Sequence, residues 1–183
     1  MNRIVVIYQS HYGTTKKYAE WIAEELNADL YEKEEIKQKK ILNNYEIIIF
    51  GGALYAGGIK GISIIKDNFN LLKDKKLIVF TCGLADPKDQ ENLKGLRKSI
   101  DKAFTAEEQK NIEFFHLRGG IDYRKLNTVH KIMMAMLKHQ LMKKDPALLN
   151  EEDKQMLETY GKRVDFTDKA ATEPIIAQIK NRD

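Results

Sequence analysis

Hydroxyl side chains and a glycine gather in one short stretch near the start of the chain. The sequence SHYGTT (residues 10–15) lies where a run of apolar residues gives way to an amphipathic pattern. The hydroxyls of Ser10, Thr14 and Thr15 can form hydrogen bonds, and Gly13 lets the backbone approach a ligand closely. A helix that begins here also points its unpaired N–H groups and its dipole at the loop. The stretch is therefore suited to bind a phosphate monoester; a Thr14 that only caps a helix is the alternative interpretation.

Other phosphate-handling sites are excluded by residues that the sequence lacks. The dinucleotide fingerprint G-x-G-x-x-G and the P-loop G-x-x-x-x-G-K-[ST] do not follow the first apolar run. A receiver domain would have acids where this chain has Gln9-Ser10 and Gly51-Gly52, and a low-molecular-weight tyrosine phosphatase would have a cysteine in the first loop. The four histidines lack metal-ligand spacing, and no Ser-His-Asp triad can be inferred. We therefore predict no metal site and assign no catalytic acid or base.

Short apolar runs alternate with amphipathic stretches along the chain. Four runs are continuously apolar, as expected of strands covered on both faces of a parallel sheet, and they span residues 3–8, 45–52, 76–83 and 112–119. A weaker alternating run at 28–35 is typical of a sheet edge. Helix patterns lie between and after these runs, at residues 14–26, 59–72, 89–104 and 173–180. The alternation predicts an α/β fold, a doubly wound five-stranded parallel sheet of order 2-1-3-4-5, with ligands bound beyond the carboxyl ends of its strands.

One segment exceeds this five-strand scheme. We expect a single domain over residues 1–183, with a helical insertion at 119–163 that contains helix patterns at 126–144 and 150–163. The first pattern has a broad apolar face opposite Lys131 and Lys138, and this face consists of Leu126, Val129, Ile132, Met133, Met136, Leu137 and Leu141. The commonest explanation is a core helix that covers the sheet. The alternative is a basic amphipathic helix that meets a membrane surface or a flat apolar substrate.

Composition and charge indicate in which compartment the protein works and what kind of partner it binds. The single cysteine cannot form an internal disulfide, and no signal peptide or apolar run of about 18 residues is present, so we expect a cytoplasmic protein. The whole chain has a net charge of +4, whereas residues 116–144 alone carry +6. This local excess favours an anionic surface or substrate, including peripheral contact with the inner face of a membrane through residues 126–144. Nucleic-acid binding is not expected, because Tyr123 alone gives no stacking platform.

The SHYGTT loop and the five-strand layout resemble those of the flavodoxins over residues 3–118 and the final helix. In that family this loop wraps the 5′-phosphate of FMN. The resemblance implies a flavodoxin-like fold with FMN as the cofactor, held also by the loops after the third and fourth strands. Tyr55 would stack on the flavin, and Gly57 or Gly58 would reach flavin N5. The implied cofactor-binding residues are Ser10, His11, Tyr12, Gly13, Thr14, Thr15, Ala53, Leu54, Tyr55, Ala56, Gly57, Thr81, Cys82, Gly83, Leu84 and Ala85.

Each of these implied roles has a simpler interpretation beside it. Tyr55 is also consistent with an ordinary aromatic of a surface loop, and Gly57, Gly58 and Gly61 with turns or close packing. Cys82 is interpreted as a small buried residue at a strand end rather than a redox thiol.

A more specific likeness covers nearly the whole chain. The sequence GGALYAGG after the third strand, the basic Met-rich insertion and RVDFTD (163–168) are similar to the quinone-dependent protoporphyrinogen oxidase family. This resemblance implies that FMN takes hydride equivalents from a tetrapyrrole and passes electrons to membrane menaquinone. Arg118, Arg124 and Lys125 would meet the propionates, or form a solvated loop. The insertion is less aromatic than that family's pattern, which leaves the substrate open.

Three other functions stay open at this stage. A flavodoxin-type one-electron carrier without its own substrate is one rival, although such carriers are usually acidic and this insertion is basic. An NAD(P)H:quinone reductase would share the flavin site. A cofactor-free interaction module is the weakest option because it leaves the clustered glycine loops unexplained. We expect an FMN-dependent oxidoreductase whose partner is a redox protein or a quinone.

Overall fold

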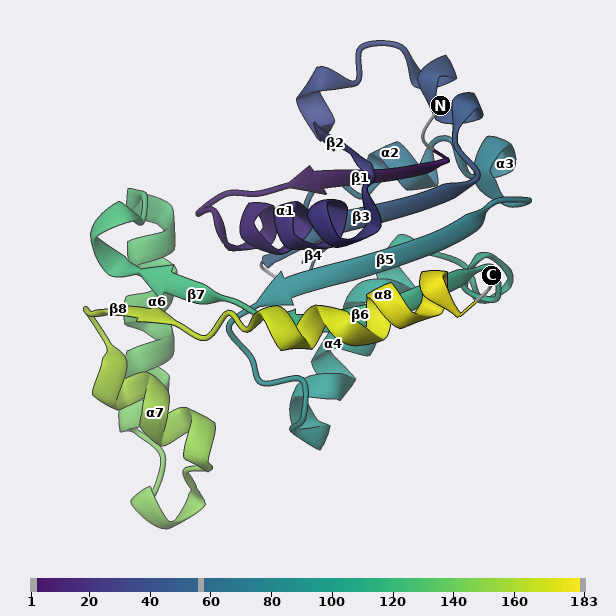
Figure 1. Ribbon diagram of the computed structural model, residues 1–183. Helices are drawn as coiled ribbons and strands as arrows, with labels where there is room; N and C mark the ends of the chain where they lie inside the picture. The colour runs from purple at the N-terminus through teal and green to yellow at the C-terminus, as the bar shows by residue number, and fades with distance from the viewer. Residues whose placement is uncertain (1–2, 56–57, 182–183) are drawn as a thin grey trace.

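The computed structural model describes residues 3–55 and 58–181 of the 183-residue chain. Its centre is a sheet of five parallel strands in the order β2-β1-β3-β5-β6, which confirms the predicted fold class and strand order (Figure 1). A short strand, β4 (Gly58–Ile59), pairs antiparallel with the end of β3. The parallel strands are β1 (Ile4–Gln9), β2 (Asp29–Glu32), β3 (Ile47–Tyr55), β5 (Lys76–Gly83) and β6 (Ile112–Arg118).

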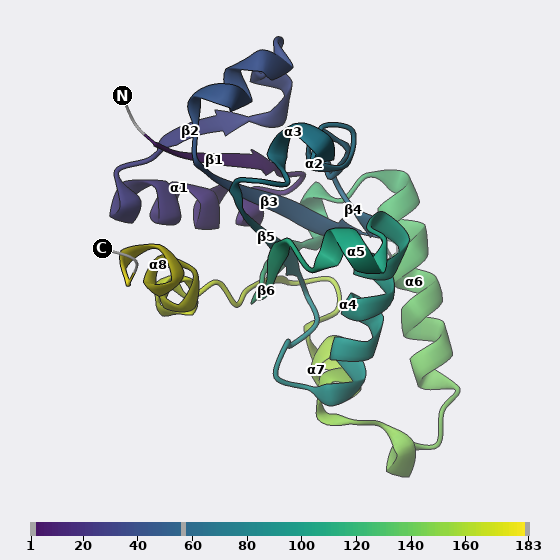
Figure 2. The ribbon, with the colours of Figure 1, turned by 90° about the vertical axis from the view of Figure 1, so that its right-hand side faces the viewer.

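Helices cover both faces of this sheet (Figure 2). On one face, α1 (Thr14–Leu26) and α8 (Glu173–Lys180) pack on strand residues such as Val6, Ile49 and Phe80. On the other, α2 (Ser63–Lys66), α3 (Phe69–Leu72) and α4 (Gln90–Ala103) pack on the alternate residues of the same strands. Because both faces are buried, the strands are apolar at successive positions, as the sequence predicted.

One short helix and five 3₁₀ turns connect these elements along the described chain. Helix α5 (Ala106–Gln109) connects α4 to β6. The 3₁₀ turns are Lys33–Glu35, Lys39–Asn44, Tyr123–Lys125, Pro146–Leu148 and Lys169–Thr172.

The predicted helix over residues 59–72 is only partly correct. Ile59 belongs to β4, and the helical part is divided into α2 and α3. Gly61 has a φ of +76°, a left-handed conformation that keeps the helix from starting earlier. Asn68 has a φ of −118° and donates a hydrogen bond from its side chain to the Ile64 carbonyl at 2.7 Å, which ends α2. Amphipathic spacing alone does not report these two interruptions.

The segment between β6 and α8 stands beyond the carboxyl ends of the strands (Figure 1). It contains α6 (Thr128–Met142) and α7 (Glu151–Thr159), close to two predicted helices. Its base is an antiparallel ribbon that we did not predict, formed by β7 (Gly120–Asp122) and β8 (Arg163–Asp165). A Cβ atom at Gly120 would lie 2.5 Å from the Val164 carbonyl oxygen, so the ribbon needs glycine there. The ribbon brings the two ends of the segment together.

The expectation that α6 covers the sheet as a core helix is wrong. Within α6, His130 and Leu141 are buried, whereas Val129 is 63% exposed and Met136 is 59% exposed. The buried edge of α6 faces a small cluster around Ile121, Tyr123 and Leu126, not the main core. Beside this buried edge, α6 presents an exposed row that we call the α6 stripe, made of Val129, Ile132, Met133, Met136 and Leu137. No helix among the residues described is long and apolar enough to cross a bilayer.

Close packing of β3 against β5 gives a stability prediction. A Cβ atom at Gly51 would lie 2.2 Å from Phe80 Cζ, inside the buried core, whereas one at Gly95 in α4 meets nothing within 4 Å. We expect Gly51→Ala to lower the free energy of unfolding by about 1–3 kcal/mol through overpacking. The matched control Gly95→Ala should raise it by about 0.5–1 kcal/mol, because alanine favours a helix interior. Urea denaturation measures both.

If overpacking against Phe80 causes the loss of stability, a smaller side chain at position 80 should relieve it. Adding Phe80→Leu to Gly51→Ala should recover part of the lost stability. Equal destabilisation by the two glycine substitutions would contradict it.

Candidate functional site

The loops that follow the parallel strands meet at one edge of the sheet and enclose a cavity of about 220 Å³. The three loops predicted to bind the cofactor all contribute residues to the wall of this cavity. The predicted residues that line it are His11, Tyr12, Thr14, Thr15, Ala53, Leu54, Cys82, Gly83 and Leu84. The structure thus brings together residues that are up to about seventy positions apart in sequence. Their role in cofactor binding stays a prediction.

The first loop has the features of an anion site. Ser10 Oγ accepts a hydrogen bond from the Gly13 N–H at 3.0 Å, which fixes the turn, and Gly13 has a left-handed φ of +95°. Helix α1 then begins at Thr14, and Gly13 has no side chain to cap it. The first N–H groups of the helix therefore lack intrahelical partners and face the loop.

Thr15 provides the sharpest feature of this loop. The residue is 1% exposed, and within 3–55 and 58–181 its hydroxyl oxygen has no partner at hydrogen-bond distance, its polar neighbour being the weakly interacting Cys82 thiol. A buried hydroxyl without a partner costs stability, so such groups are rare unless a ligand satisfies them. Uncharged N–H donors, a helix dipole and this hydroxyl together fit a phosphate monoester, and hence the phosphate end of FMN.

The end of β5 meets the same loop. Cys82 Sγ donates a weak hydrogen bond to Thr14 Oγ1 at 3.5 Å, and burial raises the pKa of the Cys82 thiol to about 11. A Cβ atom at Gly119 would lie 2.8 Å from Cys82 Sγ and 3.1 Å from Thr14 Oγ1. Glycine at 119 therefore lets the ends of β5 and β6 approach the start of α1. The buried, protonated thiol agrees with the interpretation of Cys82 as a structural residue.

The first loop also holds the insertion. The Tyr12 hydroxyl is hydrogen-bonded to His130 Nδ1 near the start of α6, and the rings of His11 and His130 are 5.2 Å apart. Burial lowers the pKa of His130, and the nearby His11 and Lys60 lower it further. A neutral imidazole at His130 is therefore favoured in this contact. Tyr12 serves as an anchor for α6 as well as a wall of the cavity.

Several predicted residues lie elsewhere. Thr81 is buried and hydrogen-bonded to His116 Nδ1 at 2.7 Å, and neither Thr81 nor Ala85 lines the cavity. Ser10 shapes the turn, and Gly13 lines an adjoining cavity of about 310 Å³. Tyr55 ends β3, but its side chain, like residues 56 and 57, is outside what the structure describes. The proposed stacking of Tyr55 and the predicted roles of Ala56 and Gly57 therefore stay predictions.

Sequence reasoning missed the wall that the insertion provides. The missed lining residues are Gly119, Gly120, Ile121, Leu126, Met133 and Met134. The glycine pair at 119–120 was the available signal, since it directly follows a predicted parallel strand. The methionines of α6 gave no such signal because helical spacing does not reveal which element a helix will face.

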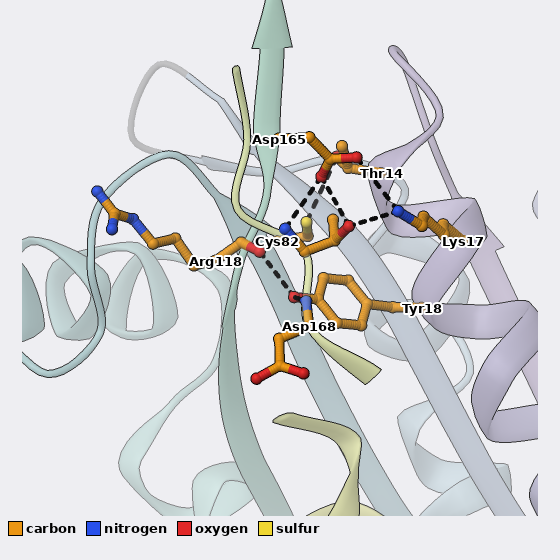
Figure 3. A network of polar contacts seen from close by, with 8 residues as sticks. Thr14, Lys17, Tyr18, Cys82, Arg118, Asp165 and Asp168 are labelled. Carbon is orange, nitrogen blue, oxygen red and sulfur yellow. Dashed lines mark hydrogen bonds and ion pairs between the residues drawn. The ribbon is translucent and has the colours of Figure 1, made fainter. Parts of the chain in front are cut away.

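A polar network joins α1 to the return of the insertion (Figure 3). Lys17 Nζ lies 3.2 Å from Asp165 Oδ2 and donates to Thr167 Oγ1 at 2.6 Å. The Tyr18 hydroxyl donates to the Arg118 carbonyl at 2.7 Å and accepts from the Asp168 N–H at 3.1 Å. The stretch RVDFTD (163–168) thus returns the chain to the core beside the candidate anion loop.

Two of the cations expected to meet substrate carboxylates have partners within the protein. Arg118 contacts Leu84, Asp86 and Gln155 and is the least available of them. Arg124 forms an ion pair with Asp122 at 3.1 Å but has a side chain that is 76% exposed. Among the residues described, no group of three or more His, Cys, Asp or Glu side chains is placed to hold a metal ion.

Comparison with known proteins gives a family match. A family model described as "Flavodoxin domain" matches residues 5–147, which is most of the chain. An uncharacterized protein of Methanocaldococcus jannaschii is 35% identical over 83 residues, which are 44% of this chain and 55% of that protein. The chain thus spans little more than half the length of this curated relative.

Solved flavoprotein structures are also similar. A flavodoxin, WrbA-like protein of Agrobacterium tumefaciens is 22% identical, with a TM-score of 0.44 over 62% of this chain and 76% of that one. The Trp repressor binding protein of Bacillus subtilis is 20% identical, with a TM-score of 0.46 over 63% and 82%. A flavoprotein of Lactobacillus acidophilus in complex with FMN is 18% identical, with a TM-score of 0.40 over 64% and 93%.

The buried thiol gives a prediction about reactivity. With a pKa of about 11 in place of an ordinary value near 9, Cys82 should hold about 100-fold less thiolate at pH 8. We expect a thiol-specific disulfide reagent to modify native Cys82 at least about 100-fold more slowly than the unfolded chain. The control is Cys82→Ala combined with Ala135→Cys, which places the thiol on an exposed position of α6. Reaction of native Cys82 within tenfold of that control would contradict the burial argument.

Proposed function

The chain belongs to the flavodoxin domain family, and on this premise we propose that it binds FMN and acts as an FMN-dependent oxidoreductase. The observation that carries the proposal is the buried, unpartnered Thr15 hydroxyl at the start of α1, beside the N–H groups of a helix without a side-chain cap. These donors would hold the FMN phosphate. No acid lies in the first turn of α1 to repel it.

The rest of the cavity would hold the flavin ring. Leu54, Gly83 and Leu84 line it beside the phosphate loop, and the wall is largely apolar. An apolar wall would exclude water from the ring while backbone groups orient its polar edge. When bound, FMN would supply hydride or electron transfer, and these residues would set its position and surroundings.

The α6 stripe supports an apolar partner for this site. Met133 both lines the cavity and belongs to the stripe, so the exposed apolar surface continues from the mouth of the site along α6. A quinone or another flat apolar molecule would fit such a surface, and methionines adapt to varied shapes. The stripe favours an enzyme with its own substrate over a carrier without one.

Within this class we propose quinone-dependent oxidation of protoporphyrinogen as the specific reaction, with peripheral membrane contact through residues 126–144. The basic, Met-rich insertion beside the cavity supports this choice. Because Arg118 is engaged within the protein, Lys125 is the better candidate to meet substrate propionates, as it is exposed and lines the cavity that adjoins the phosphate loop. An NAD(P)H:quinone reductase would use the same flavin site and the same stripe.

The second candidate function is a one-electron carrier. Helix α7 begins with Glu151, Glu152 and Asp153, and the first two of these acids line a surface hollow together with Asp86 and Asp89. Acidic surfaces of this kind dock on basic redox partners. The protein would then exchange electrons through a partner that covers α7 rather than α6.

Replacement of the unpartnered hydroxyl tests FMN binding directly. We expect Thr15→Val to leave the stability of the FMN-free chain equal or higher, since the hydroxyl has no partner there, but to weaken FMN binding by about 10- to 100-fold. Thr105→Val is the matched control, because Thr105 caps α5 far from the site. It should lower stability by about 1 kcal/mol and leave FMN affinity unchanged. Fluorescence titration and urea denaturation give the two quantities.

Thr15→Val should change FMN affinity without lowering stability, and Thr105→Val should do the reverse, so the pair separates a role in ligand binding from a structural role. Equal FMN affinity in wild type and Thr15→Val would overturn the assignment of the phosphate site.

A second experiment separates the enzyme from the carrier. The FMN-loaded protein is mixed anaerobically with protoporphyrinogen and a menaquinone analogue on vesicles of anionic lipid. We expect turnover and cosedimentation with the vesicles, and both should fall about tenfold in Met136→Glu because a charge replaces an exposed apolar side chain that would be buried against the membrane or the substrate. Leu93→Glu is the matched control, since it makes the same change at an exposed position of α4.

Other outcomes of that experiment assign other functions. Absence of substrate oxidation, with FMN reduced in two separate one-electron steps, would favour the carrier. Turnover only when a nicotinamide cofactor is supplied would favour the NAD(P)H:quinone reductase. Equal loss in Met136→Glu and Leu93→Glu would contradict a role of the α6 stripe.

A further inference from the structure

The last side chain of β6 connects three separate segments of the chain. Arg118 Nε donates to the Leu84 carbonyl at 3.1 Å, and Nη2 donates to Gln155 Oε1 in α7 at 2.6 Å. Nη1 lies 3.5 Å from Asp86 Oδ2, and the guanidinium carbon lies 3.9 Å from the centroid of the Phe166 ring. The Arg118 side chain is only 21% exposed. The loop after β5, helix α7 and the return of the insertion are thus all in contact with one guanidinium.

The loop that Arg118 contacts is part of the candidate flavin site. Leu84, whose carbonyl accepts from Arg118, lines the cavity. The neighbouring Gly119 N–H donates to the Gly83 carbonyl at 2.6 Å. The start of this loop is therefore fixed to the end of β6 by one backbone contact and one side-chain contact. A shift of Leu84 would alter the wall of the cavity.

The surroundings of Arg118 require a cation of this shape. A surface hollow around it is lined by five acids, Asp86, Asp89, Glu151, Glu152 and Glu158, and by two lysines, Lys88 and Lys154. Lys154 is already paired with Glu151, so without the guanidinium Asp86 would lose its ion pair and α7 its contact with the loop. Lysine would restore the charge but not the planar fork or the stacking on Phe166. Arginine is therefore specific to this position.

We infer that Arg118 is a positioning residue that couples the insertion to the flavin-binding loop. It holds residues 84–86 in the conformation in which Leu84 lines the site, and it docks α7 on the outside of the same loop. Its donors are directed at protein groups, so it does not recognise a substrate carboxylate. The inference rests on the proposed FMN binding, because the loop matters for function only if the cavity holds the flavin.

The experiment compares Arg118→Lys with Arg124→Lys. The control makes the same change at a neighbouring arginine whose side chain is 76% exposed and is paired with Asp122. Hydrogen exchange is measured in the FMN-free chain, and FMN affinity and the flavin midpoint potential are measured after loading. In Arg118→Lys we expect exchange to accelerate together in residues 84–89 and 151–159, FMN affinity to fall about tenfold and the potential to shift. Arg124→Lys should resemble wild type in every measurement.

A second variant keeps the test informative if Arg118→Lys folds poorly. Gln155→Ala removes only the contact with α7, and exchange should then accelerate in residues 151–159 with a smaller loss of FMN affinity. Unchanged exchange in both variants, or accelerated exchange with unchanged FMN affinity and potential, would overturn the positioning role. Failure of the wild-type chain to take up FMN would instead overturn the proposed function, and with it any role of Arg118 toward the flavin.

Discussion

Parallel pairing of the strands is the constraint on which the rest of this structure depends. Because β1, β3, β5 and β6 run in the same direction, their carboxyl ends and the loops that follow them lie along one edge. The loops of the candidate site are placed by this arrangement, from the hydroxyl loop before α1 to the glycine pair after β6. Close approach of these loops then needs small residues, and Gly119 lies where any side chain would collide with Cys82.

The insertion depends on the same edge. Tyr12 in the first loop contacts His130 of the insertion, and Arg118 at the end of β6 contacts both Gln155 of the insertion and Leu84 in the loop after β5. Its internal cluster is small, and much of α6 is exposed. Contacts with the loops that would hold the cofactor therefore act together with the β7–β8 ribbon and the contacts to α1 in setting the conformation of the insertion. A ligand that orders those loops would also order the insertion, since each contact acts in both directions.

The sequence predicted the repeating part of the fold better than the interruptions. Continuous apolar runs identified the strands because burial on both faces leaves a clear pattern, and α1 and α8 have the expected bounds. The interruption at Gly61 and Asn68 depends on individual backbone angles, and the β7–β8 ribbon is too short for a pattern. In the site, the resemblance to flavodoxins named nine residues that line the cavity, but the side-chain direction of Thr81 and the partners of Arg118 follow from tertiary contacts alone.

The paired base of the insertion has a consequence for how such a chain can vary. Gly120 and Asp165 are partners in the β7–β8 ribbon, so some forty residues leave and rejoin the core at neighbouring points. Closing a long excursion of this kind costs only slightly more conformational entropy than closing a short one, because the cost grows with the logarithm of length. Excision or replacement of everything between the two ribbon strands is thus compatible with an intact five-stranded sheet, and specificity can diversify there while the scaffold beneath stays the same.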